Sequence, residues 1–126
     1  MREIRTQKAP APVGPYSQAV EVNGFLFASG QIGINPETGK LEEGFKEQVR
    51  QIFKNLDAIL KEAGLGRESI VKVTIYLTDI SKFKELNEIY EDYFKDVPVK
   101  PARVTVGVKE LPLGAYVEIE VVAVRG

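Results

Sequence analysis

Hydrophobic residues alternate with polar or small ones in two segments near the C-terminus, residues 103–108 and residues 116–124. Both are rich in β-branched residues, and a connection containing Pro and Gly joins them, so each is predicted to be a β-strand. Because strand side chains alternate between faces, Arg103 falls opposite the valines of its strand. Glu118 and Glu120 share one face of the second strand, opposite an aliphatic row. A guanidinium and two carboxylates therefore rise from strands that are otherwise apolar.

A different spacing, of three and four residues, predicts helices at residues 45–63 and 82–94. The apolar stripe of the first helix contains Phe45, Val49, Ile52, Phe53, Leu56, Ile59, Leu60 and Ala63. The stripe of the second contains Phe83, Leu86, Tyr90, Tyr93 and Phe94. Asn87 lies near the edge of this second stripe, where its amide needs a hydrogen-bond partner. Taken alone, it is most simply a partly exposed residue bonded to water.

The N-terminal part of the chain adds more predicted strands. Asn23-Gly24, a strong hairpin signal, separates strands at residues 17–22 and 25–29. Further strands are predicted at residues 2–6 and 70–77. The proline-rich segment 9–15 cannot sustain a helix or a central strand, and we expect it to run as an ordered extended loop into Tyr16.

Two helices and about six strands predict an α+β fold in which both helices pack on one face of a mixed sheet, because each helix has a single stripe to bury. The segments 25–28 and 121–124 are nevertheless apolar on both faces. The second sheet face must therefore be covered, and another copy of the chain is the simplest cover. The pattern thus predicts a homo-oligomer.

Composition narrows the chemistry. The 126 residues suit a single domain, 1–126, and the formal net charge of −1 argues against nucleic acid as a partner. The chain contains neither Cys nor His, so we expect no disulfide, no metal site, no cofactor and no histidine base. The first residues lack the apolar core of a signal peptide, and no apolar run approaches membrane-spanning length. The cytoplasm is the expected location, with no membrane partner.

From pattern alone, Arg103 is most simply a solvated or ion-paired surface residue. However, Pro101-Ala102-Arg103, followed at a fixed interval by an apolar residue and Glu118-Ile119, resembles the signature of the reactive intermediate deaminase (Rid, YjgF-type) family. The segments 14–18 (Gly-Pro-Tyr-Ser-Gln) and 29–31 (Ser-Gly-Gln) and the region of Asn87 resemble it as well. The resemblance covers essentially the whole chain.

The resemblance implies a chorismate-mutase-like fold, a homotrimer with sites in the clefts between subunits, and hydrolytic deamination of enamine or imine acids to 2-oxo acids and ammonia. It implies 2-aminoacrylate and 2-aminocrotonate as substrates, released by pyridoxal-phosphate dehydratases. In this reading Arg103 clamps the substrate carboxylate with its planar guanidinium, and Glu118 orients the water and moves protons. Strand spacing and rise put these two residues roughly 7–10 Å apart, which would accommodate a small acid and one water.

The resemblance assigns four further residues to the site. Tyr16 would offer its hydroxyl to water or substrate, Gly30 would let the backbone approach a ligand, and Asn87 would support the pocket wall. Thr105 departs from the family pattern, since many relatives carry Cys there; its backbone N–H could still bind the substrate carboxylate. Packing or turn formation also explains Tyr16 and Gly30. Glu120 is assigned to structure or a subunit contact.

Two other functions remain open. The chain could be a non-catalytic module that binds small acids and regulates a partner enzyme, in which case Arg103 would still bind carboxylates but Glu118 would not matter. Ribonuclease or translation-inhibitor activity, also associated with parts of the family, is disfavoured by the acidic pI of about 5.6 and the absence of His.

Overall fold

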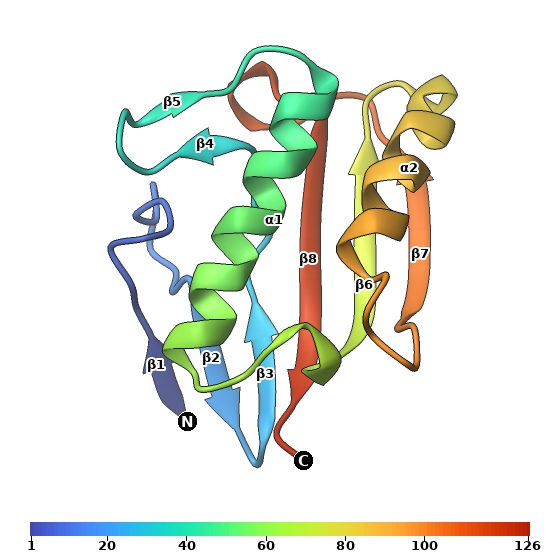
Figure 1. Cartoon of the computed structure of the whole chain (residues 1–126). Coiled ribbons are helices and arrows are strands. Elements are labelled where there is room, and N and C mark those ends of the chain that lie inside the picture. The colour runs from blue at the N-terminus through green and yellow to red at the C-terminus, as the bar shows by residue number, and fades with distance from the viewer.

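The alternating segments form one six-stranded sheet in a computed structural model that describes residues 1–126 (Figure 1). In chain order its strands are β1 (Arg2–Ile4), β2 (Ala19–Val22), β3 (Phe25–Ala28), β6 (Ile70–Leu77), β7 (Ala102–Gly107) and β8 (Val117–Val124). The spatial order is β1-β2-β3-β8-β6-β7, and β6 and β7 pair in parallel while the other neighbours are antiparallel. The sheet is mixed, as predicted, and β7 is an edge strand.

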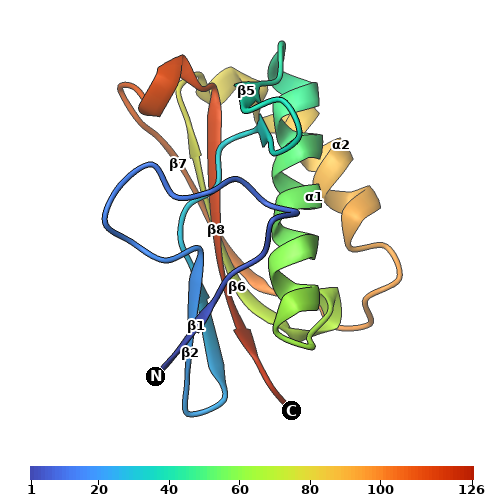
Figure 2. The same ribbon diagram turned by 90° about the vertical axis from the view of Figure 1, so that its left-hand side faces the viewer.

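Helices α1 (Phe45–Glu62) and α2 (Phe83–Tyr93) both lie on one face of the sheet, which confirms the predicted α+β architecture (Figure 2). Short elements connect these parts. They are the hairpin β4 (Ile34–Asn35) and β5 (Lys40–Leu41) and the single 3-10 turns η1 (Arg67–Ser69), η2 (Ile80–Lys82) and η3 (Pro112–Gly114). None of the helices is long and apolar enough to cross a membrane.

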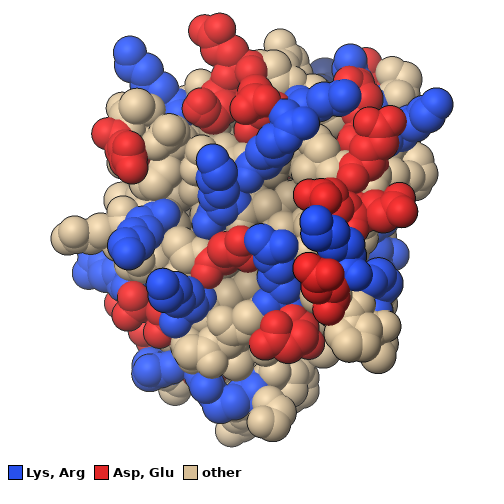
Figure 3. Space-filling view, in the orientation of Figure 1, with Lys and Arg blue, Asp and Glu red and all other residues tan.

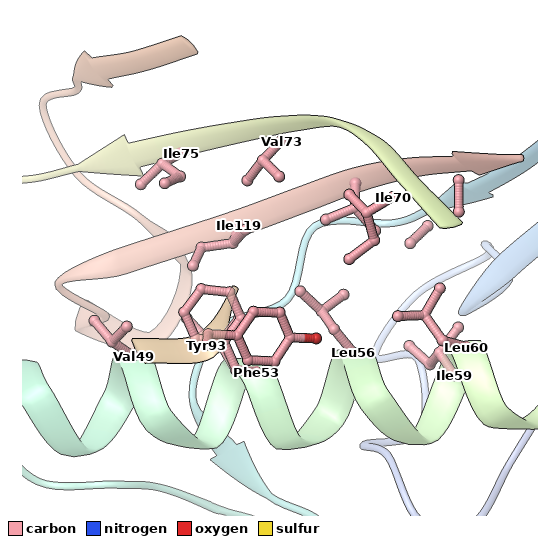
Figure 4. Packing of buried hydrophobic residues seen from close by; sticks show 14 of the residues in the cluster. Val49, Phe53, Leu56, Ile59, Leu60, Ile70, Val73, Ile75, Tyr93 and Ile119 are labelled. Carbon is pink, nitrogen blue, oxygen red and sulfur yellow. The ribbon is translucent and has the colours of Figure 1, made fainter. Parts of the chain in front are cut away.

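The core lies between the helices and the sheet, where the predicted stripes meet the buried rows of the strands (Figure 4). Val49, Leu56 and Ile59 of α1 are fully buried, as are Val73 and Ile119 of the sheet. Each fully buried aliphatic side chain stabilises the fold by roughly 1.5–3 kcal/mol relative to an exposed one. This packing fixes the helices on the sheet, and with them the position of every side chain that α2 directs toward β7.

The opposite face of the sheet has no helix over it and is partly apolar. Phe25 and Phe27 on β3 are each 44% exposed, and Val104 and Val106 on β7 are 42% and 38% exposed. The segment between β1 and β2, blue in Figure 2, extends past the sheet on this side. The predicted uncovered face is therefore real, while the oligomer that would cover it stays a prediction.

The outer surface of the helices carries charges of both signs. Figure 3 shows Lys and Arg interspersed with Asp and Glu over this side of the molecule. Several are paired, among them Arg50 with Glu47 and Arg67 with Asp57, the latter by two hydrogen bonds of 3.2 and 2.9 Å. Single-sign clustering of the kind that binds a phosphate backbone is not seen on this face.

Candidate active site

The structure places the two principal predicted residues, Arg103 and Glu118, on opposite faces of the sheet. Strand β6 lies between β7 and β8, with Val73 paired to Arg103 and Tyr76 paired to Glu118. Val73 is buried beneath the helices, so Arg103 points to the helix side and Glu118, three β6 positions along, points away from it. Within one chain these side chains do not face a common space, so their proximity across the sheet does not by itself create a gap for a small acid.

Arg103 lies against three side chains of α2. Its Nη1 donates a 2.8 Å hydrogen bond to Oδ1 of Asn87. Its Cζ lies 5.2 Å from the centre of the Phe83 ring and 4.7 Å from that of Tyr90. Positions 83, 87 and 90 are four and three residues apart, so they share the side of α2 that faces β7. The structure thus brings together Arg103 and Asn87, two of the predicted site residues.

The positive charge of Arg103 has no acidic partner in the chain. The ion pairs of the molecule involve Arg2, Lys46, Arg50, Arg67, Lys82, Lys95 and Arg125, and Arg103 is absent from them. A guanidinium offers five N–H donors, of which Asn87 accepts one. Arg103 therefore keeps both its charge and most of its donors available for an anion.

The free edge of β7 adds backbone donors beside this guanidinium. The N–H of Val108 donates to the carbonyl oxygen of Leu77 at 2.8 Å, so even-numbered residues of this strand direct their amides toward β6. By the two-residue repeat, the N–H groups of Arg103 and Thr105 point to the unpaired edge. The Thr105 side chain shares the face of Arg103, and its hydroxyl is buried without a hydrogen-bond partner.

Glu118 lies in a cavity of about 500 Å³ together with Tyr16 and Gly30, two more predicted residues. Gln31 and Ile119 exchange backbone hydrogen bonds of 2.9 and 3.0 Å, which holds the 29–31 segment beside β8. Much of the remaining lining is apolar and comes from Pro10, Pro12, Val13, Ile32, Pro112 and Leu113. Tyr16 is half-exposed, and its hydroxyl accepts a 3.4 Å hydrogen bond from the N–H of Val13.

The Glu118 carboxyl is electrostatically unusual. Partial burial, and then the nearby carboxylate of Glu120, raise the pKa of Glu118 above its ordinary value. Glu120 in turn accepts a 2.5 Å hydrogen bond from the hydroxyl of Tyr76. No Lys or Arg forms an ion pair with Glu118. A carboxyl with a raised pKa can both accept and return a proton, as general acid–base chemistry requires.

Two functional features escaped the sequence reasoning. Phe83 and Tyr90 look like core residues in the helix stripe, yet their rings contact Arg103. Gln18 is buried and fastens the proline-rich loop: Nε2 donates to the carbonyl oxygens of Thr6, Ala9 and Pro10, and Oε1 accepts from the N–H of Thr6. Two features of the sequence could have indicated these roles. Asn87 lies four residues after Phe83 and three before Tyr90, and Gln18 is the last residue of the 14–18 motif.

The side chains do not assemble a metal site, since no group of three or more acidic, His or Cys residues is placed to hold an ion. The candidate residues form two half-sites, one around Arg103 and one around Glu118, which offer a cation for an anion and a carboxyl group for proton transfer. One half-site, on the edge of β7, suits a carboxylate. The other, around Glu118, suits proton transfer.

Comparisons with known proteins show the family of this chain. A family model described as endoribonuclease L-PSP matches residues 6–125. A RutC family protein of Aquifex aeolicus is 86% identical over 99% of this chain and 100% of its own length, and the human 2-iminobutanoate/2-iminopropanoate deaminase is 47% identical over 99% and 90%. The crystal structure of E. coli TdcF with bound serine has a TM-score of 0.96 at 38% identity and covers all of both chains. The chain belongs to the endoribonuclease L-PSP family, the family of the Rid proteins.

Proposed function

We propose that this protein hydrolyses 2-imino and 2-enamino acids to 2-oxo acids and ammonia. The observation that carries the proposal is the uncompensated guanidinium of Arg103 at a free strand edge, in a chain that also holds a carboxyl with a raised pKa in a cavity. The relatives named 2-iminobutanoate/2-iminopropanoate deaminase in human and mouse support the reaction class at 47% identity each. The TdcF structure with bound serine supports a small amino-acid-like ligand.

The complete site in this proposal spans two subunits. Because Arg103 and Glu118 lie on opposite faces of one sheet, a substrate can reach both only if the β7 edge of one subunit meets the Glu118 cavity of the next. The exposed side chains of Phe25, Phe27 and Val104 supply an apolar surface for such a contact. A closed ring of three subunits, the homotrimer expected from the resemblance, would repeat this contact at each interface.

In the proposed reaction, Arg103 and the free N–H of Thr105 hold the substrate carboxylate and fix the C=N carbon near Glu118. The Glu118 carboxylate accepts a proton from water as the water oxygen bonds to that carbon, and protonated Glu118 gives this proton to the imine nitrogen, which leaves a carbinolamine. Glu118 then accepts the proton of the new hydroxyl group and passes it to the amine nitrogen; the carbonyl forms, the C–N bond breaks, and ammonia leaves with Glu118 again ionised. Atoms and charge balance, with water the sole co-reactant. Positioning and proton transfer suffice here, because such imines also hydrolyse unaided.

The substrates we propose are the three- and four-carbon acids 2-aminoacrylate and 2-aminocrotonate and their imine tautomers. We expect pyridoxal-phosphate dehydratases acting on serine and threonine to supply them, and we propose that the protein acts beside those enzymes in the cytoplasm. A ribonuclease activity has less support, because the cavity of Glu118 is lined by prolines and aliphatic residues and the net charge of the chain is −1.

The test is a coupled reaction in which a threonine dehydratase supplies the imine and 2-oxobutanoate and ammonia are measured over time. The wild type should accelerate ammonia release above the spontaneous rate, and Arg103→Ala should abolish the acceleration. Arg103→Lys should also lose most of it, because an ammonium group cannot bind a carboxylate bidentately. Light scattering should find the same oligomer for all three proteins. A wild type no faster than an equal mass of serum albumin would overturn the proposal.

A further inference from the structure

Two aromatic side chains contact the guanidinium that the proposed reaction needs, and sequence reasoning would have left them in the core. We infer that Phe83 and Tyr90 are positioning residues that set the orientation of the Arg103 guanidinium and thereby its affinity for the substrate carboxylate. The inference rests on the proposed function, because it concerns the same half-site. It assigns to α2 a role beyond packing on the sheet.

The Arg103 guanidinium lies over two aromatic rings of α2. Both ring centres lie within the roughly 6 Å over which a cation is attracted to an aromatic face, at 5.2 Å for Phe83 and 4.7 Å for Tyr90. The hydrogen bond to Asn87 fixes one N–H of Arg103, but a single hydrogen bond leaves the guanidinium free to turn about it. Two rings on the same helix restrict that rotation, so the remaining donors keep a constant direction.

Tyr90 carries a hydroxyl group as well as a ring. Its hydroxyl is buried without a hydrogen-bond partner, so the ring, not the hydroxyl, is what Tyr90 contributes here. Burial raises the pKa of Tyr90, which keeps the phenol neutral across the physiological range. The contact with Arg103 is therefore one of a cation with an uncharged ring, and it leaves the arginine's charge intact.

The groups of α2 that contact the Arg103 guanidinium are all neutral. A carboxylate would also fix the guanidinium, but it would neutralise the charge and compete with the substrate for the same donors. Rings and an amide orient the side chain without this competition. Arg67 shows the alternative in the same molecule: it lies 4.0 Å from the Tyr93 ring centre but is also bonded to Asp57, and so is already neutralised.

Ordering an arginine side chain at the moment of binding costs conformational entropy, and a side chain already ordered in the free protein avoids that cost. Removing either ring should therefore weaken carboxylate binding while leaving the proton-transfer step unchanged. Loss of one cation–ring contact of this kind corresponds to about a tenfold change in affinity.

The experiment measures the dissociation constant of 2-oxobutanoate by calorimetry, together with kcat and KM in the coupled assay, for Phe83→Leu, Tyr90→Leu and Tyr90→Phe. The leucine variants should bind 2-oxobutanoate about tenfold more weakly and raise KM, with kcat within about threefold of wild type. Tyr90→Phe keeps the ring and should bind 2-oxobutanoate with the wild-type affinity. Tyr93→Leu is the matched control: it removes a buried aromatic of α2 that lies against Arg67, and should lower the melting temperature without changing affinity.

Asn87→Asp separates orientation from charge. It keeps the shape of the group that accepts from Arg103 but adds a carboxylate, so it should hold the guanidinium in place and still weaken 2-oxobutanoate binding at least tenfold. Leucine variants that bind within twofold of wild type, or a Tyr93→Leu that binds as weakly as they do, would overturn the inference, as would a wild type that binds no 2-oxo acid. A wild type that binds 2-oxobutanoate but does not accelerate imine hydrolysis would overturn the proposed function alone, and the binding data would still decide the role of the rings.

Discussion

The carboxylate of Glu118 occupies the space in which any residue other than glycine at position 30 would carry its side chain. A Cβ placed on Gly30 would overlap Oε2 of Glu118 and lie 2.8 Å from its Cδ. The backbone hydrogen bonds between Gln31 and Ile119 hold the two segments at this separation. The glycine was expected to let the backbone approach a ligand, whereas in the chain itself it lets the backbone approach Glu118. The position of the Glu118 carboxylate therefore depends on the absence of a side chain at Gly30.

Gly30→Ala should consequently act through Glu118. The added methyl must push the carboxyl aside, and a displacement of about 1 Å at a reacting group lowers kcat/KM about 100-fold. Binding of 2-oxobutanoate to Arg103 should change little. The double variant Gly30→Ala/Glu118→Gln should be no slower than Glu118→Gln alone, because the methyl then has no functional carboxylate to displace. Additive losses would mean that Gly30 contributes separately, as a ligand contact.

A site shared between subunits makes a prediction that a single-chain site does not. Arg103→Ala subunits retain Glu118, and Glu118→Gln subunits retain Arg103, so in the proposed homotrimer each mixed assembly contains one interface with both residues intact. Random mixing of equal amounts should restore about a quarter of the wild-type sites, although each variant alone is inactive. Mass spectrometry under native conditions would verify that mixed oligomers form. If mixed oligomers form and no activity returns, the two residues do not act across an interface. As a negative control, mixtures of Glu118→Gln with Glu118→Ala should stay inactive, because no subunit then carries Glu118.

The acid limb of the pH profile should report the pair of carboxylates on β8. Glu120 is the second cause, after burial, of the raised pKa of Glu118. In the proposed reaction Glu118 must be ionised to activate water, so kcat/KM should fall as the pH drops through this raised pKa. Glu120→Gln removes the neighbouring negative charge, which should lower the pKa of Glu118 and move the acid limb to lower pH.

Comparing variants on one substrate cancels the ionisation of the substrate itself. Tyr76→Phe serves as the control, because it removes the hydrogen bond to Glu120 but keeps both carboxylates. The acid limb of the kcat/KM profile of Tyr76→Phe should lie at higher pH than that of Glu120→Gln. The same shift affects stability: between the ordinary and the raised pKa of Glu118 the folded state binds more protons than the unfolded state, so stability decreases as the pH rises. Glu118→Gln should remove that dependence, and an unchanged limb in Glu120→Gln would show that burial alone sets the pKa.

The elements of this fold could be predicted from sequence because their signals are local. An apolar stripe at three- and four-residue intervals arises whenever one side of a helix such as α1 is buried. The alternation in β7 and β8 arises whenever the two faces of a strand differ in burial. Both patterns were confirmed, as was the placement of α1 and α2 on one face. The uncovered apolar face followed from the same reasoning, since Phe25 and Phe27 alternate with buried neighbours.

The relation between Arg103 and Glu118 could not be obtained in this way. Alternation assigns side chains to faces within one strand, but only the register with β6 decides whether an odd position on β7 and an even one on β8 share a face. That register depends on pairing across the whole sheet. For the same reason the contact between Tyr76 and Glu120, 44 residues apart, has no local signal. Motif spacing selected Arg103 and Glu118 as candidates, and the sheet register places them on opposite faces.

The structure indicates which groups of Thr105 are available to a ligand. Its side-chain hydroxyl is buried without a partner, whereas its N–H points to the free edge of β7 beside Arg103. Thr105→Val preserves the shape and removes only the hydroxyl, so it should leave kcat/KM within about threefold of wild type. Unfolding measurements should find it at least as stable, because an unsatisfied buried hydroxyl costs about 1–3 kcal/mol. Thr105→Cys should resemble Thr105→Val in both kcat/KM and stability. A loss beyond tenfold in the valine variant, with the oligomer intact, would instead assign substrate binding to the hydroxyl.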